Sequence, residues 1–237
     1  SEIIQLFAAM ASADGKVTVE ETKFIKNYFN SLYPENFAGI LFCEFEKSVQ
    51  AGIKTETLLS SVHRRLNQND KTFLIIKLIE LMATDETDAS EKKMLYTIAN
   101  KFQIPAENID FLILLLTGPH DYNVKSTEGP YHFLTISDSE SADVQLPYKG
   151  LKMKIINIGK SLIIVQQDNL CDVQLNDKQL VKGFTARIPA NGQIRINATY
   201  EIIYQDLRYY FKNLQTSADT LFVSETFKEL EISENLS

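Results

Sequence analysis

The spacing of apolar residues changes once along the chain. From residue 2 to residue 116, apolar positions recur every three or four residues, as they do on one face of an α-helix. This spacing predicts seven helices separated by short turns. Asn69 or Asp70 can cap the fifth helix, which contains Phe73–Met82. The fifth and seventh helices are apolar on nearly all sides, so we expect them to form the centre of a helical bundle.

From Tyr131 onwards, apolar and polar residues alternate and β-branched residues become frequent, which predicts short strands. The expected strands cover residues 131–136, 151–158, 162–166, 172–175, 185–188, 193–196, 201–205 and 208–211. The pairs Asn176-Asp177 and Asn191-Gly192 are typical of hairpin turns, because these residue types tolerate a positive φ. Short strands at this spacing favour a β-sandwich.

The two patterns together predict an α+β multidomain protein. An all-α bundle of about seven helices is expected at residues 1–117 and an all-β sandwich at residues 131–214. Residues 118–130 are rich in Gly, Pro, Asp, Asn, Ser and Thr, so we expect a domain linker there. Residues 215–237 are rich in Ser, Thr and Glu and have the composition of a tail or of a linker to a further domain.

Composition narrows the classes of protein that the chain can belong to. With 44% hydrophobic and 23% charged residues among 237, it resembles a soluble globular protein. It has neither a membrane-spanning apolar run nor a signal peptide pattern, so we expect a cytoplasmic location, at the inner face of the membrane if a membrane domain follows. Cys43 and Cys171 lie far apart, which fits a reducing compartment. The net charge of −7 and the absence of a basic stripe argue against nucleic acid as a partner and give no reason to expect insertion into a membrane.

An acidic turn occurs twice in the helical half. In residues 10–21 and again in residues 82–91, an apolar helix ends in a small-residue turn carrying Asp, and the next helix begins with Glu in its first turn. The repeat indicates an internal duplication that collects carboxylates at two matching places. Thr18 with Glu21, and Asp88 with Glu91, have the spacing of capping boxes. Capping explains these residues, whereas it does not require an Asp at the same place in both turns.

The first turn partly matches a calcium-binding EF-hand loop. If Gly15 takes the sixth position of that loop, Glu21 falls on the twelfth, where a bidentate ligand belongs. However, Met10 stands where the leading Asp should be, and Lys92 takes the last position in the second copy. A high-affinity calcium loop is therefore not expected.

A short motif in the first turn indicates a family. Residues 13–21 read Ala-Asp-Gly-Lys-Val-Thr-Val-Glu-Glu, and residues 84–86 read Thr-Asp-Glu where a second Ala-Asp-Gly would be usual. The first 116 residues thus resemble the TerB-like family associated with tellurite resistance, an all-helical domain built from two related halves. In that family the acidic residues are suspected of binding metal. The resemblance extends a divalent-metal role to four residues: Asp14, Glu21, Asp85 and Glu91.

The β half resembles a forkhead-associated (FHA) domain, a sandwich whose loops usually read phosphothreonine. The segments that carry the resemblance are 136–146, 173–180 and 190–194. The residues that would bind phosphate differ: Asp138 stands at the family's Arg position and Cys171 at its Asn position. The Ser and His of the family's next loop fall near Lys149 and Lys152, which are the remaining candidates for phosphopeptide binding.

The motifs of common enzymes are absent from the sequence. The chain has no glycine-rich phosphate loop, no nucleophile elbow and no His-Glu-x-x-His, and its three histidines are scattered, so we expect no catalytic activity. The order of the two domains resembles the cytoplasmic N-terminal region of bacterial ABC-transporter ATP-binding proteins. That resemblance implies a non-catalytic regulatory or protein-interaction region, whose partner is another protein or a downstream domain of the same polypeptide. The alternatives are a divalent-metal-binding stress protein and a phosphopeptide-binding adaptor.

Overall fold

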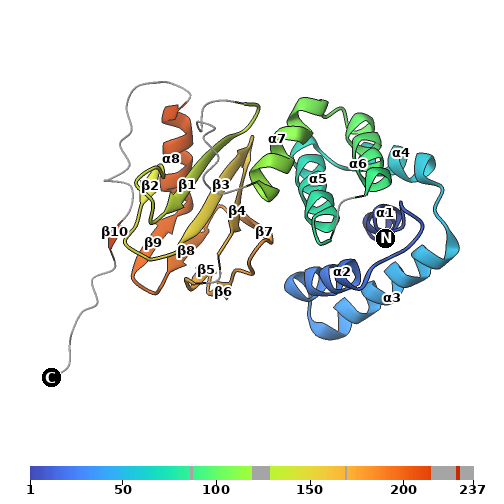
Figure 1. Cartoon of the computed structure of the whole chain (residues 1–237), viewed down its shortest axis with the longest axis horizontal. Helices are drawn as coiled ribbons and strands as arrows, with labels where there is room; N and C mark the ends of the chain where they lie inside the picture. Colours follow the sequence, from blue (N-terminus) through green and yellow to red (C-terminus); the bar gives the residue numbers. More distant parts are fainter. Residues whose placement is uncertain (86–87, 119–128, 169, 215–227, 230–237) are drawn as a thin grey trace. The chain divides into compact units, whose positions relative to one another are not determined.

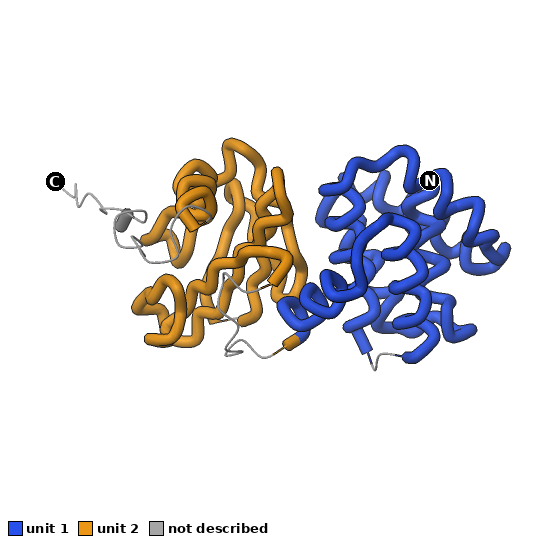
Figure 2. Tube along the Cα trace, turned by 90° about the horizontal axis from the view of Figure 1, so that it is seen from above, with its two compact units in different colours: residues 1–117 blue, residues 118–237 orange. Residues whose placement is uncertain are grey.

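The computed structural model describes residues 1–85, 88–118, 129–168, 170–214 and 228–229. The chain divides into two compact units, Ser1–Thr117 and Gly118–Ser237, which are coloured separately in Figure 2. We call them the helical unit and the β unit. Most of the predicted linker at 118–130, and of the predicted tail at 215–237, lies outside the described residues.

The helical unit contains the seven helices that the apolar spacing predicted (Figure 1). They are α1 (Glu2–Ala11), α2 (Val19–Leu32), α3 (Glu35–Ala51), α4 (Thr55–Arg65), α5 (Gln68–Met82), α6 (Ala89–Lys101) and α7 (Ala106–Thr117). The central position expected for α5 is confirmed, since 11 of its 15 residues are buried. The same expectation for α7 is wrong, because only Ile109, Leu112 and Leu115 are buried there. The other apolar side chains of α7 stay partly exposed, so this helix borders the core instead of forming its centre.

The start of α5 also differs from the prediction. Asn67 caps the helix, and its side-chain oxygen accepts a hydrogen bond from the backbone N–H of Asp70 at 3.0 Å. Asn67 has extended backbone angles directly before the first helical residue, Gln68. Asn69 and Asp70 therefore already belong to the first turn and cannot cap it.

The β unit consists of two five-stranded sheets, with strand orders β2-β1-β3-β4-β7 and β10-β9-β8-β5-β6. The strands are β1 (His132–Ser137), β2 (Val144–Gln145), β3 (Lys152–Ile158), β4 (Ser161–Gln166), β5 (Val173–Leu175), β6 (Lys178–Gln179), β7 (Thr185–Ile188), β8 (Gln193–Ile196), β9 (Tyr200–Ile203) and β10 (Lys228–Glu229). Leu134, Ile155 and Ile164 of one sheet share a buried cluster with Val173 and Ile194 of the other. The two sheets thus form the predicted sandwich.

The strand predicted at residues 208–211 is wrong, because this segment lies in the helix α8 (Tyr204–Leu214), beside β1 and β9 in Figure 1. Leu207, Tyr210 and Phe211 are buried and follow one another at helical spacing, and they join the core of the sandwich. Tyr209 is 64% exposed. The consecutive aromatic residues look like part of a strand, whereas the burial follows the period of a helix.

One of the two predicted hairpin turns is confirmed. Asn176 and Asp177 have φ of 48° and 62° and join the antiparallel strands β5 and β6. The pair Asn191-Gly192 instead connects β7 to β8, which belong to different sheets, so no hairpin forms there. Gly192 is needed for space, since a Cβ atom at this position would lie 2.5 Å from Ile188 Cγ2. Among the described helices, none combines the length and the apolar character that a membrane span requires.

Candidate functional site

The first acidic turn, between α1 and α2, is held by a capping box. The backbone N–H of Thr18 donates to Glu21 Oε2 at 2.8 Å, and the backbone N–H of Glu21 donates to Thr18 Oγ1 at 3.2 Å. Gly15 has the positive φ expected of it, at 92°, and Asp14 Oδ1 accepts a hydrogen bond from the Lys16 N–H at 3.0 Å. The turn therefore fixes the carboxylate of Glu21 at the start of α2 and leaves Asp14 exposed.

The second acidic turn, between α5 and α6, has the same construction. The backbone N–H of Asp88 donates to Glu91 Oε2 at 3.1 Å, and Asp88 Oδ1 accepts from the Ser90 N–H at 2.6 Å. This hydrogen bond from Ser90 lowers the pKa of Asp88. Both capping boxes predicted from the sequence are thus confirmed. Each turn places one Glu at the third position of a helix.

The two capping glutamates are buried, at 2% exposed for Glu21 and 4% for Glu91. Burial raises the pKa of Glu21 to about 7, against the opposing effect of its hydrogen bonds to Thr18, and the charges of Glu91 and Asp85 add to the increase. Burial also raises the pKa of Glu91, and the charges of Asp85 and Asp14 contribute. The four acidic residues singled out in the sequence are therefore close enough to act on one another. We call them the acidic cluster.

One oxygen of the acidic cluster lacks a hydrogen-bond donor. Glu21 Oε1 is buried and accepts no hydrogen bond from any residue that the structure describes. Glu91 is its neighbour, and the two carboxyl groups interact directly when one of them carries a proton. Two carboxylates this close cannot both be charged at low energetic cost, so the charge of Glu91 adds to the effect of burial in raising the pKa of Glu21.

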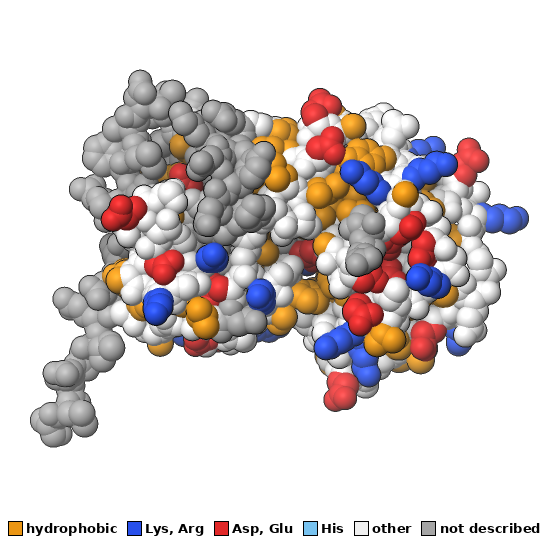
Figure 3. Space-filling model, viewed as in Figure 1, with side chains coloured by type: hydrophobic (Ala, Val, Ile, Leu, Met, Phe, Trp, Pro, Cys, Tyr) orange, Lys and Arg blue, Asp and Glu red, His pale blue; other side chains and the backbone are white. Residues whose placement is uncertain are grey.

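The ligands offered by the acidic cluster are carboxylate oxygens alone, which are the ligands that Mg²⁺, Ca²⁺ and Mn²⁺ prefer. Within the described ranges, no group of three or more His, Cys, Asp or Glu side chains stands in an arrangement that could hold a metal ion. The carboxylate oxygens therefore suit a divalent cation chemically. Their side chains would have to move to surround the ion, because the described residues do not already form such an arrangement. Figure 3 shows acidic side chains (red) gathered on one face of the helical unit.

In the segments around the predicted phosphopeptide residues Lys149 and Lys152, carboxylates accept hydrogen bonds from backbone N–H groups. Asp138 Oδ2 accepts the Gly150 N–H at 2.8 Å. Asp168, which is 7% exposed, accepts the Lys152 N–H at 2.7 Å and the Cys171 N–H at 3.1 Å. Sequence reasoning did not single out Asp168. Its only signal was an acidic residue in the turn that follows an apolar strand.

The two predicted lysines occupy different settings. Lys149 is exposed in the turn before β3, and Lys152 is the half-buried first residue of that strand. Asp138 and Asp168 contact the backbone of this segment, through the N–H groups of Gly150 and Lys152. Cys171 is a buried free thiol, 6% exposed, and burial raises its pKa.

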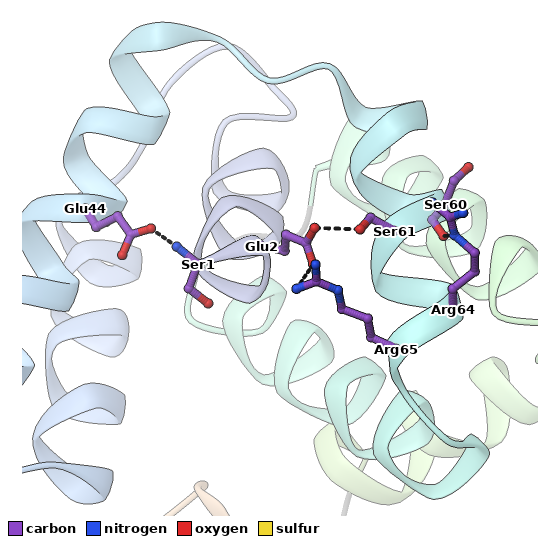
Figure 4. Close-up of polar contacts among 7 residues, drawn as sticks. All are labelled: Ser1, Glu2, Glu44, Ser60, Ser61, Arg64 and Arg65. Carbon is purple, nitrogen blue, oxygen red and sulfur yellow. Dashed lines mark hydrogen bonds and ion pairs between the residues drawn. The ribbon is translucent and has the colours of Figure 1, made fainter.

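Two basic residues of α4, Arg64 and Arg65, form polar contacts within the helical unit (Figure 4). Arg65 Nη1 lies 3.1 Å from Glu2 Oε2, and Ser61 Oγ donates to Glu2 Oε1 at 2.6 Å, which ties α4 to α1. Arg64 donates from Nε to a carbonyl of its own helix at 3.3 Å. A cavity of about 620 Å³ beside these contacts is lined by both acidic and basic residues. This region joins helices, and it has no surplus of one charge that would select a ligand.

Comparison with known proteins gave one finding. Searches of curated proteins and of solved structures found no match. The model of the family described as "Tellurite resistance protein TerB" matches residues 1–112, which include both acidic turns, so the helical unit is similar to that family.

Proposed function

We propose that the helical unit is a non-catalytic domain that binds a divalent cation at the acidic cluster. The observation that carries the proposal is Glu21 Oε1, a buried carboxylate oxygen that has no hydrogen-bond donor among the described residues and lies beside a second buried carboxylate. Burial of a carboxylate destabilises the folded protein unless the group is protonated, paired with a positive charge or bound to a metal ion. Protonation satisfies this requirement below neutral pH, and a cation satisfies it above.

Binding requires only small movements at the exposed side of the cluster. Asp14 is exposed, and its carboxylate accepts a hydrogen bond from the exposed backbone N–H of Lys16, two residues on, so its side chain can turn toward Glu91. Asp85 is half-buried and already acts on both glutamates. Glu21 and Glu91 each use Oε2 for the capping box, and Oε1 of Glu21 accepts no hydrogen bond from the described residues. A hard cation of the size of Mg²⁺ or Mn²⁺ suits such a set of oxygens.

Cation binding at this cluster must compete with protons. The pKa of Glu21 is about 7, so a cation that binds at this pH displaces a proton from part of the molecules. The affinity should therefore rise with pH across neutrality. It should also depend on Glu21 more than on exposed acidic residues nearby.

Isothermal titration calorimetry of the full chain with Mg²⁺, Ca²⁺, Mn²⁺ and Zn²⁺ tests the proposal. Each titration is run at about pH 6 and about pH 8, in two buffers of different ionisation enthalpy, so that proton release appears as a buffer-dependent heat. The Glu21→Gln variant keeps the size of the side chain and removes its charge, and Glu20→Gln, an exposed neighbour, is the matched control. The proposal is supported if the Glu20→Gln control binds the cation and the Glu21→Gln variant does not. The absence of binding in the unmodified chain, or equal binding by both variants, contradicts it.

The second candidate is a regulatory region of a bacterial ABC-transporter ATP-binding protein, which acts on a downstream domain of the same polypeptide. It is favoured by an exposed apolar corner between α2 and α3, where Leu32, Tyr33, Phe37 and Ile40 are 41–63% exposed. The rings of Tyr33 and Phe37 lie edge to face at 5.3 Å. Exposed apolar patches mark interaction surfaces. The coding sequence after Ser237 tests this candidate, since an ATPase domain in the same frame supports it and any other continuation contradicts it.

A further inference from the structure

A second cavity, of about 500 Å³, lies within the β unit at one end of the sandwich. Its lining comes from the first residues of β1, the last residues of β3, the turn that follows β3, and α8. A cavity of this size can hold a ligand as large as a small metabolite. The cavity adjoins the start of β1 and the end of β3. Asp138 and Lys149 lie at the opposite end of these two strands, after the end of β1 and before the start of β3.

The floor of this cavity has a buried polar residue at a position where the core-facing side of the strands predicts an apolar one. Asn157 of β3 lies directly opposite His132 of β1, and the same face continues through Leu134 and Ile155, which belong to the core. Asn157 is 9% exposed, and its Oδ1 accepts no hydrogen bond from the residues that the structure describes. An amide oxygen left in this state is destabilising unless a ligand supplies a donor.

The wall of the cavity includes two cationic side chains. Arg208 and Lys212 stand one helical turn apart on α8, and both line the cavity. Arg208 Nη1 donates to the carbonyl oxygen of Gly159 at 3.1 Å, which holds the turn after β3 against the helix. A guanidinium has five N–H donors, so this bond leaves donors for a ligand. No Asp or Glu is among the described residues that line the cavity.

We infer that this cavity binds a small phosphate monoester that also carries hydroxyl or amino groups, such as a sugar phosphate or a nucleoside monophosphate. The guanidinium of Arg208 provides positive charge for a phosphate monoester, which carries nearly two negative charges. Arg208 can form the paired hydrogen bonds that phosphate oxygens favour. Asn157 Oδ1 accepts a hydrogen bond from a hydroxyl or amino group of the ligand, and the aromatic side chains of Tyr131 and Tyr209 border the remaining space.

The test uses the full chain with ribose 5-phosphate, adenosine 5′-monophosphate and inorganic phosphate as probes, followed by two-dimensional NMR and calorimetry. We expect binding with chemical shift changes at α8 and the end of β3, and a loss of about tenfold or more in affinity in Arg208→Gln, since a charge-assisted contact is removed. Arg195→Gln is the matched control, because Arg195 of β8 pairs at 2.8 Å with Asp177 in the turn between β5 and β6. The control should bind as the unmodified chain does.

A second variant tests the role of the buried amide. Asn157→Leu removes the acceptor at similar size, so it should weaken ribose 5-phosphate binding and leave inorganic phosphate unaffected. Thermal unfolding of each variant verifies that it is folded. The inference is overturned if none of the probes binds at millimolar concentration, or if Arg208→Gln binds as tightly as the control. Equal effects of Asn157→Leu on ribose 5-phosphate and inorganic phosphate would overturn the role of Asn157.

Discussion

The raised pKa of Glu21 makes the stability of the helical unit depend on pH in a direction that can be measured. Its pKa rises from an ordinary value of 4.5 in the unfolded chain to about 7 in the folded protein. At a pH between these two pKa values, Glu21 holds a proton in the folded protein and has released it in the unfolded chain. The free energy of unfolding therefore decreases as the pH rises through this window, and the stabilising contribution is complete only below it.

The size of the effect follows from the same two values. At about 1.4 kcal/mol for each pKa unit, the step from 4.5 to about 7 corresponds to about 3 kcal/mol lost between acidic and slightly basic pH. The lowered pKa of Asp88 acts in the opposite sense, and only at a pH below the Glu21 window. The Glu21→Gln variant cannot release this proton, and its amide oxygen can still accept the Thr18 N–H. The variant should thus lose less stability than the unmodified chain over the same pH range.

Urea unfolding followed by far-ultraviolet circular dichroism, at about pH 5 and about pH 8, measures the difference. We expect Glu21→Gln to gain about 2–3 kcal/mol relative to the unmodified chain on going from the lower to the higher pH. Glu20→Gln, which changes an exposed side chain of the same turn, should show no such gain. If the difference between Glu21→Gln and the unmodified chain is the same at both pH values, Glu21 does not hold a proton near neutrality and the reasoning fails.

Three further predictions concern stability, and each is measured by chemical or thermal unfolding. Thr18→Ala removes the capping oxygen that accepts the Glu21 N–H at 3.2 Å, so it should destabilise the helical unit by about 1 kcal/mol. Thr22→Ala, on the same helix, is the control. Lys77→Met breaks a buried ion pair of 2.8 Å with Glu80, and should cost about 3–5 kcal/mol, while Lys77→Met combined with Glu80→Leu should recover most of the loss. Gly192→Ala should destabilise the β unit by about 1–3 kcal/mol because its Cβ would lie 2.7 Å from the Pro189 carbonyl oxygen, and Gly183→Asn, at a positive φ with open space, should be tolerated better.

Most of the helical unit could be predicted from local sequence. The helices are amphipathic at the expected period, and the caps Thr18 and Asp88 use residue types whose side chains bond to neighbouring N–H groups. These features depend on residues a few positions apart. The cap at Asn67 was missed because three suitable residue types, Asn67, Asn69 and Asp70, follow one another closely and only the backbone angles distinguish them.

The site was only partly predictable. The duplication indicated that the carboxylates of the two turns occupy matching places, but it could not show that Glu21 and Glu91 meet and are buried, because that depends on how the two halves pack. The helix α8 was taken for a strand because three aromatic residues in a row suit either structure until the burial of Leu207 and Tyr210 is known. Asn157 was hidden for a related reason, since a polar residue in a strand that already contains Lys152 and Lys154 gives no sign of the cavity beside it.

The double use of the two capping glutamates limits how the helical unit can evolve. Each closes the first turn of a helix through one oxygen and contributes its charge to the cluster through the whole carboxylate. A change to Ala at Glu21 would remove the charge and fray the start of α2 together, so neutral drift cannot abolish the charge without harming the fold. Substitution by Gln is the one single step that separates the two roles. Descendants of this protein that have given up the charge while keeping the bundle should therefore carry Gln at these positions.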